Sequence, residues 1–179
     1  MQRSAIYDDI TAKEVATSTR YTPIEDYSII GDLKTAALVG RCGGLDFMCF
    51  PEFDSPSIFC ANADAEHGGC YTITPQLESM REQHMYLPDT NVLITRFLSE
   101  TGVAEISNFM RISKDTEREQ VLVRRAKCVR GEVRFRLCFE PRFDYGREQH
   151  VVQMEGTRRA VFQSKGASTL SLAFQSEIP

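Results

Sequence analysis

Alternation of apolar and polar residues with a period of two predicts β-strands over most of the chain from residue 35 onward. The clearest case is segment 132–140, in which an apolar series alternates with mostly charged residues; the apolar series is Val133, Phe135, Leu137 and Phe139. In a strand, a period of two places one set of side chains toward a core and the other mostly toward water. We therefore expect Val133, Phe135, Leu137 and Phe139 to face the core.

Glycine-containing turns divide the remaining apolar segments into hairpins. Segments 35–41 and 45–50 are separated by Cys42-Gly43-Gly44, and segments 91–99 and 103–112 flank Glu100-Thr101-Gly102. Glycine supplies the positive φ that a tight hairpin turn needs. Segment 120–130 precedes 132–140 across Gly131, so we expect those two strands to be antiparallel neighbours. Segments 158–165 and 169–175 continue the pattern, with Leu170, Leu172 and Phe174 pointing one way.

Short strands at this spacing are typical of an all-β antiparallel β-sandwich. Only segment 56–63 has the pattern of a short helix, and no long crossover helices alternate with the strands, which excludes a parallel α/β fold. Residues 1–20 are polar and lack clear periodicity, and we interpret them as a flexible N-terminal extension. Residues 21–179 then form one sandwich domain, which either ends near Pro179 or is cut before its last strands.

Composition excludes several classes of function. The chain has 179 residues, of which 42% are hydrophobic and 26% charged, with a net charge of −4. A weakly acidic globular domain offers no electrostatic reason to bind nucleic acid or an anionic membrane. No apolar run approaches the ~20 residues that span a bilayer. Residues 1–10 contain no apolar signal segment, so we expect a cytoplasmic protein.

The chain contains six cysteines, at positions 42, 49, 60, 70, 128 and 138. No CxxC pair occurs among them, which argues against a zinc ribbon and a thioredoxin-like site. Six cysteines allow 15 pairings, and the sequence does not choose among them. In a cytoplasmic protein, reduced thiols that act as small core or strand residues are the favoured interpretation.

No set of residues in the sequence defines a catalytic or metal site. The three histidines, His67, His84 and His150, are far apart, and no cluster has metal-ligand spacing. Several carboxylates lie near turns; they are Glu25, Asp26, Asp32, Asp46, Asp54, Asp89 and Asp144. Turn capping explains such positions more often than acid–base catalysis. We therefore assign no catalytic residue, no metal and no cofactor.

Two four-residue motifs echo each other, each after an apolar strand. They are Pro51-Glu52-Phe53-Asp54 and Pro141-Arg142-Phe143-Asp144. We interpret both as strand-exit tips, in which proline ends the ladder and aspartate caps the turn.

Four segments together resemble one enzyme family. They read YTPIEDYSIIGDLKTAALVGRCGGLDFMCFPEFD (21–54), YLPDTNVLITRF (86–97), VAEISNFM (103–110) and FEPRFDYGR (139–147). In this order they resemble the family 15 glycoside hydrolases, the glucoamylase and trehalase-like enzymes. The resemblance implies a super-β-sandwich followed by a helical (α/α) toroid that carries two catalytic glutamates. Such enzymes hydrolyse α-glucosidic bonds with inversion, without a metal or organic cofactor.

No series of amphipathic helices in this chain could build that toroid, so the resemblance implies an accessory domain. Its expected partners are the helical catalytic domain and, at the pocket rim, an α-glucan or glucose disaccharide. The alternative is a stand-alone β-sandwich module for binding or assembly. A surface shaped for a toroid also predicts self-association of the isolated chain, with segment 35–50 as the expected participant because its weak alternation suggests cover on both faces.

The best candidates for a pocket rim are Phe47, Phe53 and Asp54. An aromatic ring can cover the apolar face of a sugar, and a carboxylate can accept a hydrogen bond from a hydroxyl; core packing of Phe47 and turn capping by Asp54 are the structural alternatives. In the family that the chain resembles, this strand usually reads Asp-Trp-Leu-Cys, whereas this chain has Asp46-Phe47-Met48-Cys49. The change removes an indole stacking surface and its N–H donor.

Overall fold

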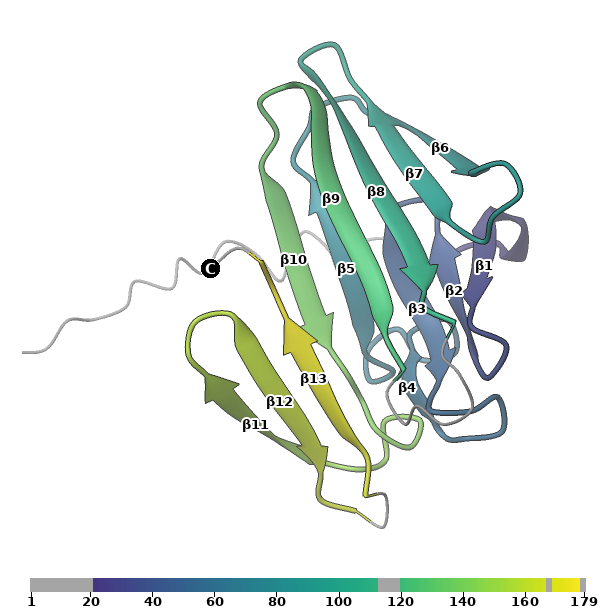
Figure 1. The fold of residues 1–179 in the computed structure, drawn as a ribbon, viewed down its shortest axis with the longest axis vertical. Coiled ribbons are helices and arrows are strands. Elements are labelled where there is room, and N and C mark those ends of the chain that lie inside the picture. Colours follow the sequence, from purple (N-terminus) through teal and green to yellow (C-terminus); the bar gives the residue numbers. More distant parts are fainter. Residues whose placement is uncertain (1–20, 113–119, 167–168, 178–179) are drawn as a thin grey trace, which may run out of the picture.

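The computed structural model describes residues 21–112, 120–166 and 169–177 and confirms an all-β antiparallel fold (Figure 1). The described elements are one 3-10 turn, η1 (Ile24–Asp26), and the strands β1 (Tyr27–Gly31), β2 (Ala36–Gly40), β3 (Gly44–Cys49), β4 (Ser57–Cys60), β5 (Cys70–Pro75), β6 (Arg81–Tyr86), β7 (Leu93–Leu98), β8 (Gly102–Met110), β9 (Leu122–Gly131), β10 (Phe135–Glu140), β11 (His150–Glu155), β12 (Arg159–Ser164) and β13 (Ser171–Gln175). The expected N-terminal extension, 1–20, lies outside the described residues.

Three antiparallel sheets make up the domain. The largest runs β1-β2-β3-β5-β10, with β4 added to β3; the second runs β6-β7-β8-β9 and the third β11-β12-β13. In Figure 1 the second sheet lies in front of the largest one, and the third sheet lies beside it, in front of the lower part of β10. The second and third sheets therefore cover different parts of the same face.

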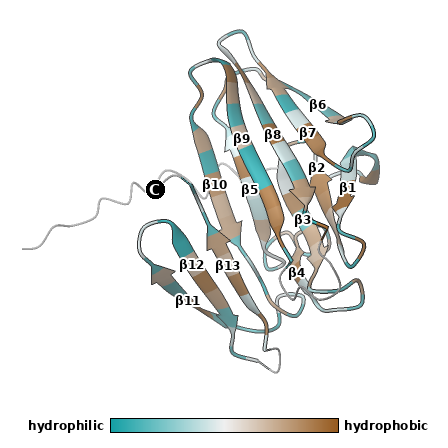
Figure 2. Cartoon of the chain, viewed as in Figure 1, coloured by the Kyte–Doolittle hydropathy of each residue, from teal (hydrophilic) through white to brown (hydrophobic). Residues whose placement is uncertain are grey.

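The core lies between these layers, as the burial of alternate residues shows. Phe97 on β7 and Leu45 on β3 are fully buried, and Phe162 on β12 joins the same cluster. Under the third sheet, Phe139 packs edge-on against Tyr71 and Phe162, with ring centroids 5.0 and 5.1 Å apart. Figure 2 shows apolar residues alternating with polar ones along the strands that enclose this core.

The two predicted hairpins are confirmed, and their glycines explain the turns. Strands β2 and β3 pair across Gly43, whose φ is +83°, and β7 pairs with β8 across residues 99–101. A Cβ on Gly43 would lie 2.7 Å from the Ile73 carbonyl oxygen, so only glycine fits there. The strands predicted in the last two segments are also confirmed, as β12 and β13, and the structure pairs them with each other.

The short helix predicted at 56–63 is wrong. Ser57–Cys60 forms β4, which pairs with β3, and all four of its residues are buried. A strand that is buried on both faces has no alternation, and a run this short cannot be distinguished from a buried helical turn by periodicity.

The predicted pairing of 120–130 with 132–140 is also wrong. Strand β9 pairs with β8, whereas β10 crosses to the other layer and pairs with β5. Gly131, with φ +77°, lies at the crossing. Consecutive strands are neighbours only about two-thirds of the time, so their order along the chain does not decide the pairing.

The core assignment for β10 is correct in part. Phe135 and Phe139 pack against the core cluster, as does Val133 before the strand, but Leu137 is 45% exposed. Leu137 shares the inner face with Phe135 and Phe139, yet no described strand covers it.

Candidate functional site at the turn end of the sandwich

The β1–β2 turn is built by Asp32. Its buried carboxylate accepts hydrogen bonds from the Lys34 and Thr35 N–H groups through Oδ1, at 3.0 and 2.9 Å. This Asx-type capping closes the turn and leaves Leu33 at φ +75° with 83% of its surface exposed. A large apolar side chain therefore projects into solvent from a rigid turn.

The first Pro-x-Phe-Asp tip lies against this turn. The Phe53 N–H donates to the Lys34 carbonyl at 2.9 Å, and the Phe53 ring is 62% exposed. Within the tip, the Glu52 N–H donates to Ser55 Oγ at 3.1 Å. The capping group of this tip is thus Ser55, and the prediction that Asp54 caps the turn has no support among the described hydrogen bonds.

The second tip meets the first through β4. The Arg142 N–H donates to the Ile58 carbonyl at 2.9 Å, and the Tyr145 N–H donates to the Ser57 carbonyl at 3.3 Å. Phe143 is buried and anchors the tip in the core. The two motifs that echo each other in sequence are therefore neighbours in space at one end of the domain.

Three consecutive residues, from the last residue of the second tip onward, adopt positive φ. These are Asp144, Tyr145 and Gly146, at +51°, +57° and +81°. Left-handed backbone is unfavourable for residues other than glycine and is maintained only where the surrounding structure enforces it, commonly at functional sites. The turn presents Tyr145, 47% exposed, with the Arg147 guanidinium 5.6 Å from its ring centroid.

Contacts on both sides hold this turn. Arg147 forms an ion pair with Asp144 at 2.7 Å. The neighbouring Cys49 raises the pKa of the Tyr145 phenol above its usual value. We call the exposed side chains of Leu33, Phe53 and Tyr145, which lie on turns at this end of the domain, the turn-end patch.

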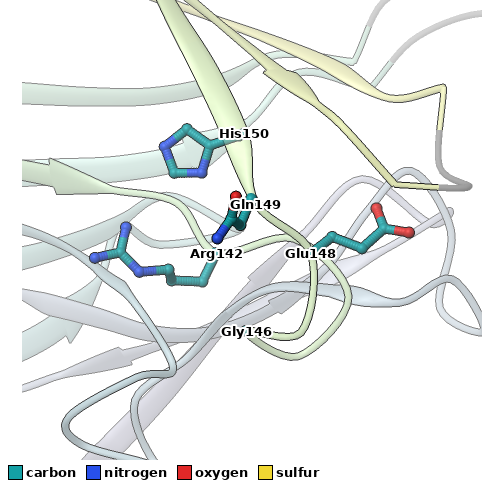
Figure 3. A pocket seen from close by; sticks show the side chains of 5 residues that line it. All are labelled: Arg142, Gly146, Glu148, Gln149 and His150. Carbon is teal, nitrogen blue, oxygen red and sulfur yellow. The ribbon is translucent and has the colours of Figure 1, made fainter.

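A hollow of about 290 Å³ lies beside the second tip (Figure 3). Its lining comprises Arg142, Gly146, Glu148, Gln149 and His150. Figure 3 shows Arg142 and His150 on one side and the Glu148 carboxylate pointing away from them. That carboxylate accepts a hydrogen bond from Ser164 Oγ. The lining thus does not place two carboxylates on opposite sides of a sugar, as glycoside hydrolysis requires.

His150 packs between two aromatic rings. It lies between Phe143 and Phe162, with ring centroids 5.7 Å from each. Burial, followed by the positive charges of Arg142 and Lys165, lowers the pKa of His150 below its usual value. The hollow can offer guanidinium, imidazole and amide groups to a polar ligand, and a cationic imidazole is disfavoured there.

The three predicted rim residues do not form one cluster. Phe53 and Asp54 are exposed in the first tip, whereas Phe47 is half-buried on β3. The β2–β3 register skips Asp46, and this bulge turns Phe47 away from the core cluster. Core packing therefore does not explain Phe47. Leu33 and Tyr145 also lie at the turn end, and the sequence did not predict them as site residues. The sequence indicates only that each lies in a turn, after Gly31-Asp32 and within Asp144-Tyr145-Gly146.

The same bulge builds a polar pair on the outer side of β3. Tyr27 donates its hydroxyl to Asp46 Oδ2 at 2.9 Å. Burial raises the pKa of Asp46 and raises that of Tyr27 to about 12. This pair joins β1 to β3 across β2. It is a single carboxylate with a phenol, and the part of the chain that the structure describes has no group of three or more ligands suited to a metal ion.

Comparison with known proteins identifies the family. The family model described as "Trehalase-like, N-terminal" matches residues 13–172, which include both tips and the hollow. The chain belongs to this family. Within the described residues, no helix is long and apolar enough to cross a membrane.

Curated relatives of this trehalase-like domain are trehalases. The chain is 29% identical to the trehalase of Mycobacterium tuberculosis over 143 residues, which cover 71% of this chain and 21% of that protein. It is 34% identical to trehalase 1 of Sulfolobus acidocaldarius over 124 residues, covering 69% of this chain and 20% of the relative. The chain therefore matches only about a fifth of the length of these relatives. No solved structure matches it significantly.

Proposed function

We propose that this chain is the N-terminal accessory domain of a trehalase-like hydrolase of glycoside hydrolase family 15. In this proposal a separate helical region carries the acid and base that hydrolyse an α-glucosidic bond, and the sandwich packs against it and orients it. The observation that carries the proposal is the family match over residues 13–172, combined with relatives that are about five times longer than the matched part. The enzymatic activity belongs to the whole polypeptide, and the substrate is a glucose disaccharide or α-glucan.

The turn-end patch is the surface that we assign to the catalytic region. Leu33 and Phe53 are 83% and 62% exposed, and each is fixed on a hydrogen-bonded turn. Large apolar side chains gathered at one exposed end of a domain suit a contact with another domain. Aspartate at Leu33 or Phe53 should lower trehalose hydrolysis by the whole polypeptide without lowering the stability of this domain. Ile24→Asp is the matched control, because Ile24 is 75% exposed in η1, at the opposite end of β1.

Phe47, Phe53 and Asp54 remain our candidates for the rim of the sugar pocket. The bulge frees Phe47 from the core, and Phe53 and Asp54 lie in the exposed first tip. A rim contact affects KM more than kcat, because it binds substrate and transition state alike. Asp54→Asn in the whole polypeptide should therefore raise KM for trehalose at nearly constant kcat. Equal loss of kcat and kcat/KM would place Asp54 in the chemical step instead.

The isolated chain provides the direct test of the accessory role. Purified residues 1–179 should release no glucose from trehalose, maltose or soluble starch above a buffer control. Turnover that disappears on mutation of Glu25 or Asp54 would overturn the proposal and place the chemistry in the sandwich. A cytoplasmic location is part of the proposal, and the free thiols of all six cysteines support it.

The second candidate is a stand-alone module for binding or assembly. The exposed apolar residues of the turn end support it as well, because they would serve any protein partner. The two proposals differ in what the domain needs: an accessory domain works only in the same polypeptide as, or in complex with, a hydrolase.

A further inference from the structure

Strand β10 ends the largest sheet with a free edge. It pairs with β5 on one side, and none of the described strands pairs with its other side. The Gln76 N–H donates to the Arg134 carbonyl at 2.8 Å, so Arg134 and its alternate residues face β5. By alternation, the amides of Phe135, Leu137 and Phe139 point toward the free edge. A row of amides that no described strand pairs with is a template for another strand.

The third sheet extends past this edge and leaves apolar side chains uncovered. In Figure 1, β11 and β12 lie beyond β10. Val152 pairs with buried Phe162 and Met154 with buried Ala160, so both share the core face of the sheet. They are nevertheless 50% and 62% exposed. Leu137, on the core face of β10, is 45% exposed.

We propose that a second copy of this chain covers this edge, with the two β10 strands paired antiparallel about a two-fold axis at Leu137. The largest sheets of both copies then form one continuous sheet. In this register the ladder spans residues 134–140, and core-facing residues pair only with core-facing residues, because Phe135 lies opposite the second copy's Phe139. This register needs the amides of Phe135, Leu137 and Phe139 to point toward the second copy, and these are the amides that face the free edge.

Charge complementarity favours this register. Arg134 lies opposite the second copy's Glu140, and symmetry repeats the pair, so the ladder contains two cross-strand ion pairs. Strand β9, the free edge of the second sheet, cannot pair with itself in this way, because its exposed charges, Arg125, Lys127 and Arg130, are all positive.

The two-fold axis also brings the uncovered apolar residues of each copy against the other copy. The third sheet lies over the C-terminal half of β10, through Phe139 and Phe162. Because the strands run in opposite directions, the overhanging Val152 and Met154 of one copy lie toward the other copy's β10, where Leu137 is exposed beside the axis. Each copy therefore covers what the other exposes, as an isologous interface requires.

The sequence favours segment 35–50 through the faces of its strands, whereas this proposal uses a strand edge. Segment 35–50 contains β2 and β3, and each has strands on both sides within the sheet. Their edges are therefore not available, and the free edge lies at β10.

Charge reversal with rescue tests the proposal on the chain of residues 1–179. Sedimentation equilibrium should give about twice the monomer mass of 20.3 kDa at tens of micromolar. Arg134→Glu places like charges opposite each other twice and should raise the dimer dissociation constant roughly tenfold or more. Glu140→Arg added to Arg134→Glu should restore the dimer. Arg136→Glu is the matched control, because Arg136 lies on the same face opposite the second copy's Cys138 and should change little.

A second pair of variants tests the apolar contact. Val152→Asp should favour the monomer, whereas Val151→Asp should not, because Val151 is 43% exposed on the opposite face of the same strand. A monomeric wild-type chain, or equal effects of Arg134→Glu and Arg136→Glu, would overturn the proposal. Failure of this test leaves the proposed accessory function untouched, since that function is judged by hydrolysis.

Discussion

Removal of the Arg124 guanidinium should destabilise the domain more than any other single change of an arginine on β9. Arg124 projects from β9 into the interior, where its Nε donates to Asn108 Oδ1 at 2.8 Å. Its two terminal nitrogens donate to the carbonyls of Tyr71 and Gly43, and its Cζ lies 4.5 Å from the Tyr71 ring centroid. One side chain thus joins the second sheet to β5 and to the β2–β3 turn.

The expected magnitude follows from the acceptors left behind. Arg124→Met keeps much of the volume but leaves two backbone carbonyls and one amide oxygen without their donor. Breaking such a buried charged network typically costs about 3–5 kcal/mol, because each orphaned group loses a hydrogen bond to a cation. With a urea m-value of roughly 2 kcal/mol/M, the unfolding midpoint should fall by about 1.5–2.5 M.

Urea titration followed by circular dichroism at fixed protein concentration is the assay. Arg125→Met is the matched control, since Arg125 is the next residue, is exposed and faces outward beside Ser107. Its unfolding free energy should change by less than about 0.5 kcal/mol, as is usual for a surface substitution. A loss below about 1 kcal/mol for Arg124→Met, or equal losses for the two variants, would refute the reasoning.

Three further predictions follow from burial and strand content. Far-ultraviolet circular dichroism should show a β spectrum, and a spectrum dominated by helix would contradict the fold. Burial, followed by the charge of Arg41, lowers the pKa of His84 below 6.5, so the unfolded chain binds the proton more readily and stability should fall as pH drops through 6.5. His84→Gln should weaken that dependence, and a pH profile identical to that of the wild-type protein would exclude His84 as the cause. Thiol titration should modify exposed Cys128 in the native protein and buried Cys49 and Cys60 only after unfolding, and rapid native reaction of all three would contradict their burial.

Local features of the fold could be predicted from the sequence. The turns at Gly43 and at residues 99–101 give the hairpins, because positive φ and flanking apolar runs are properties of neighbouring residues. Pairing across the layers could not be predicted in this way. Whether β10 joins β9 or β5 depends on core contacts such as Phe139 with Tyr71, which lie far apart in the chain.

In the candidate site, too, local features could be predicted from the sequence and long-range contacts could not. Phe53 is exposed on a rigid tip, and both tips lie in segments, 21–54 and 139–147, that resemble one family. Their proximity depends on β4, which the sequence presented as a helical turn. The orientation of Phe47 depends on a one-residue bulge at Asp46, and hydrophobic pattern alone does not reveal such an insertion.

The central claim is that this sandwich serves a trehalase-like hydrolase without catalysing the reaction itself. The most direct measurement is glucose release from trehalose by the native protein, captured from its source cells with an antibody against residues 21–177 and sized in the same experiment. Trehalose hydrolysis by the captured material, from a polypeptide or complex several times larger than 20.3 kDa, is the predicted result. A captured 20.3 kDa species without hydrolase activity would contradict the claim and support the stand-alone module.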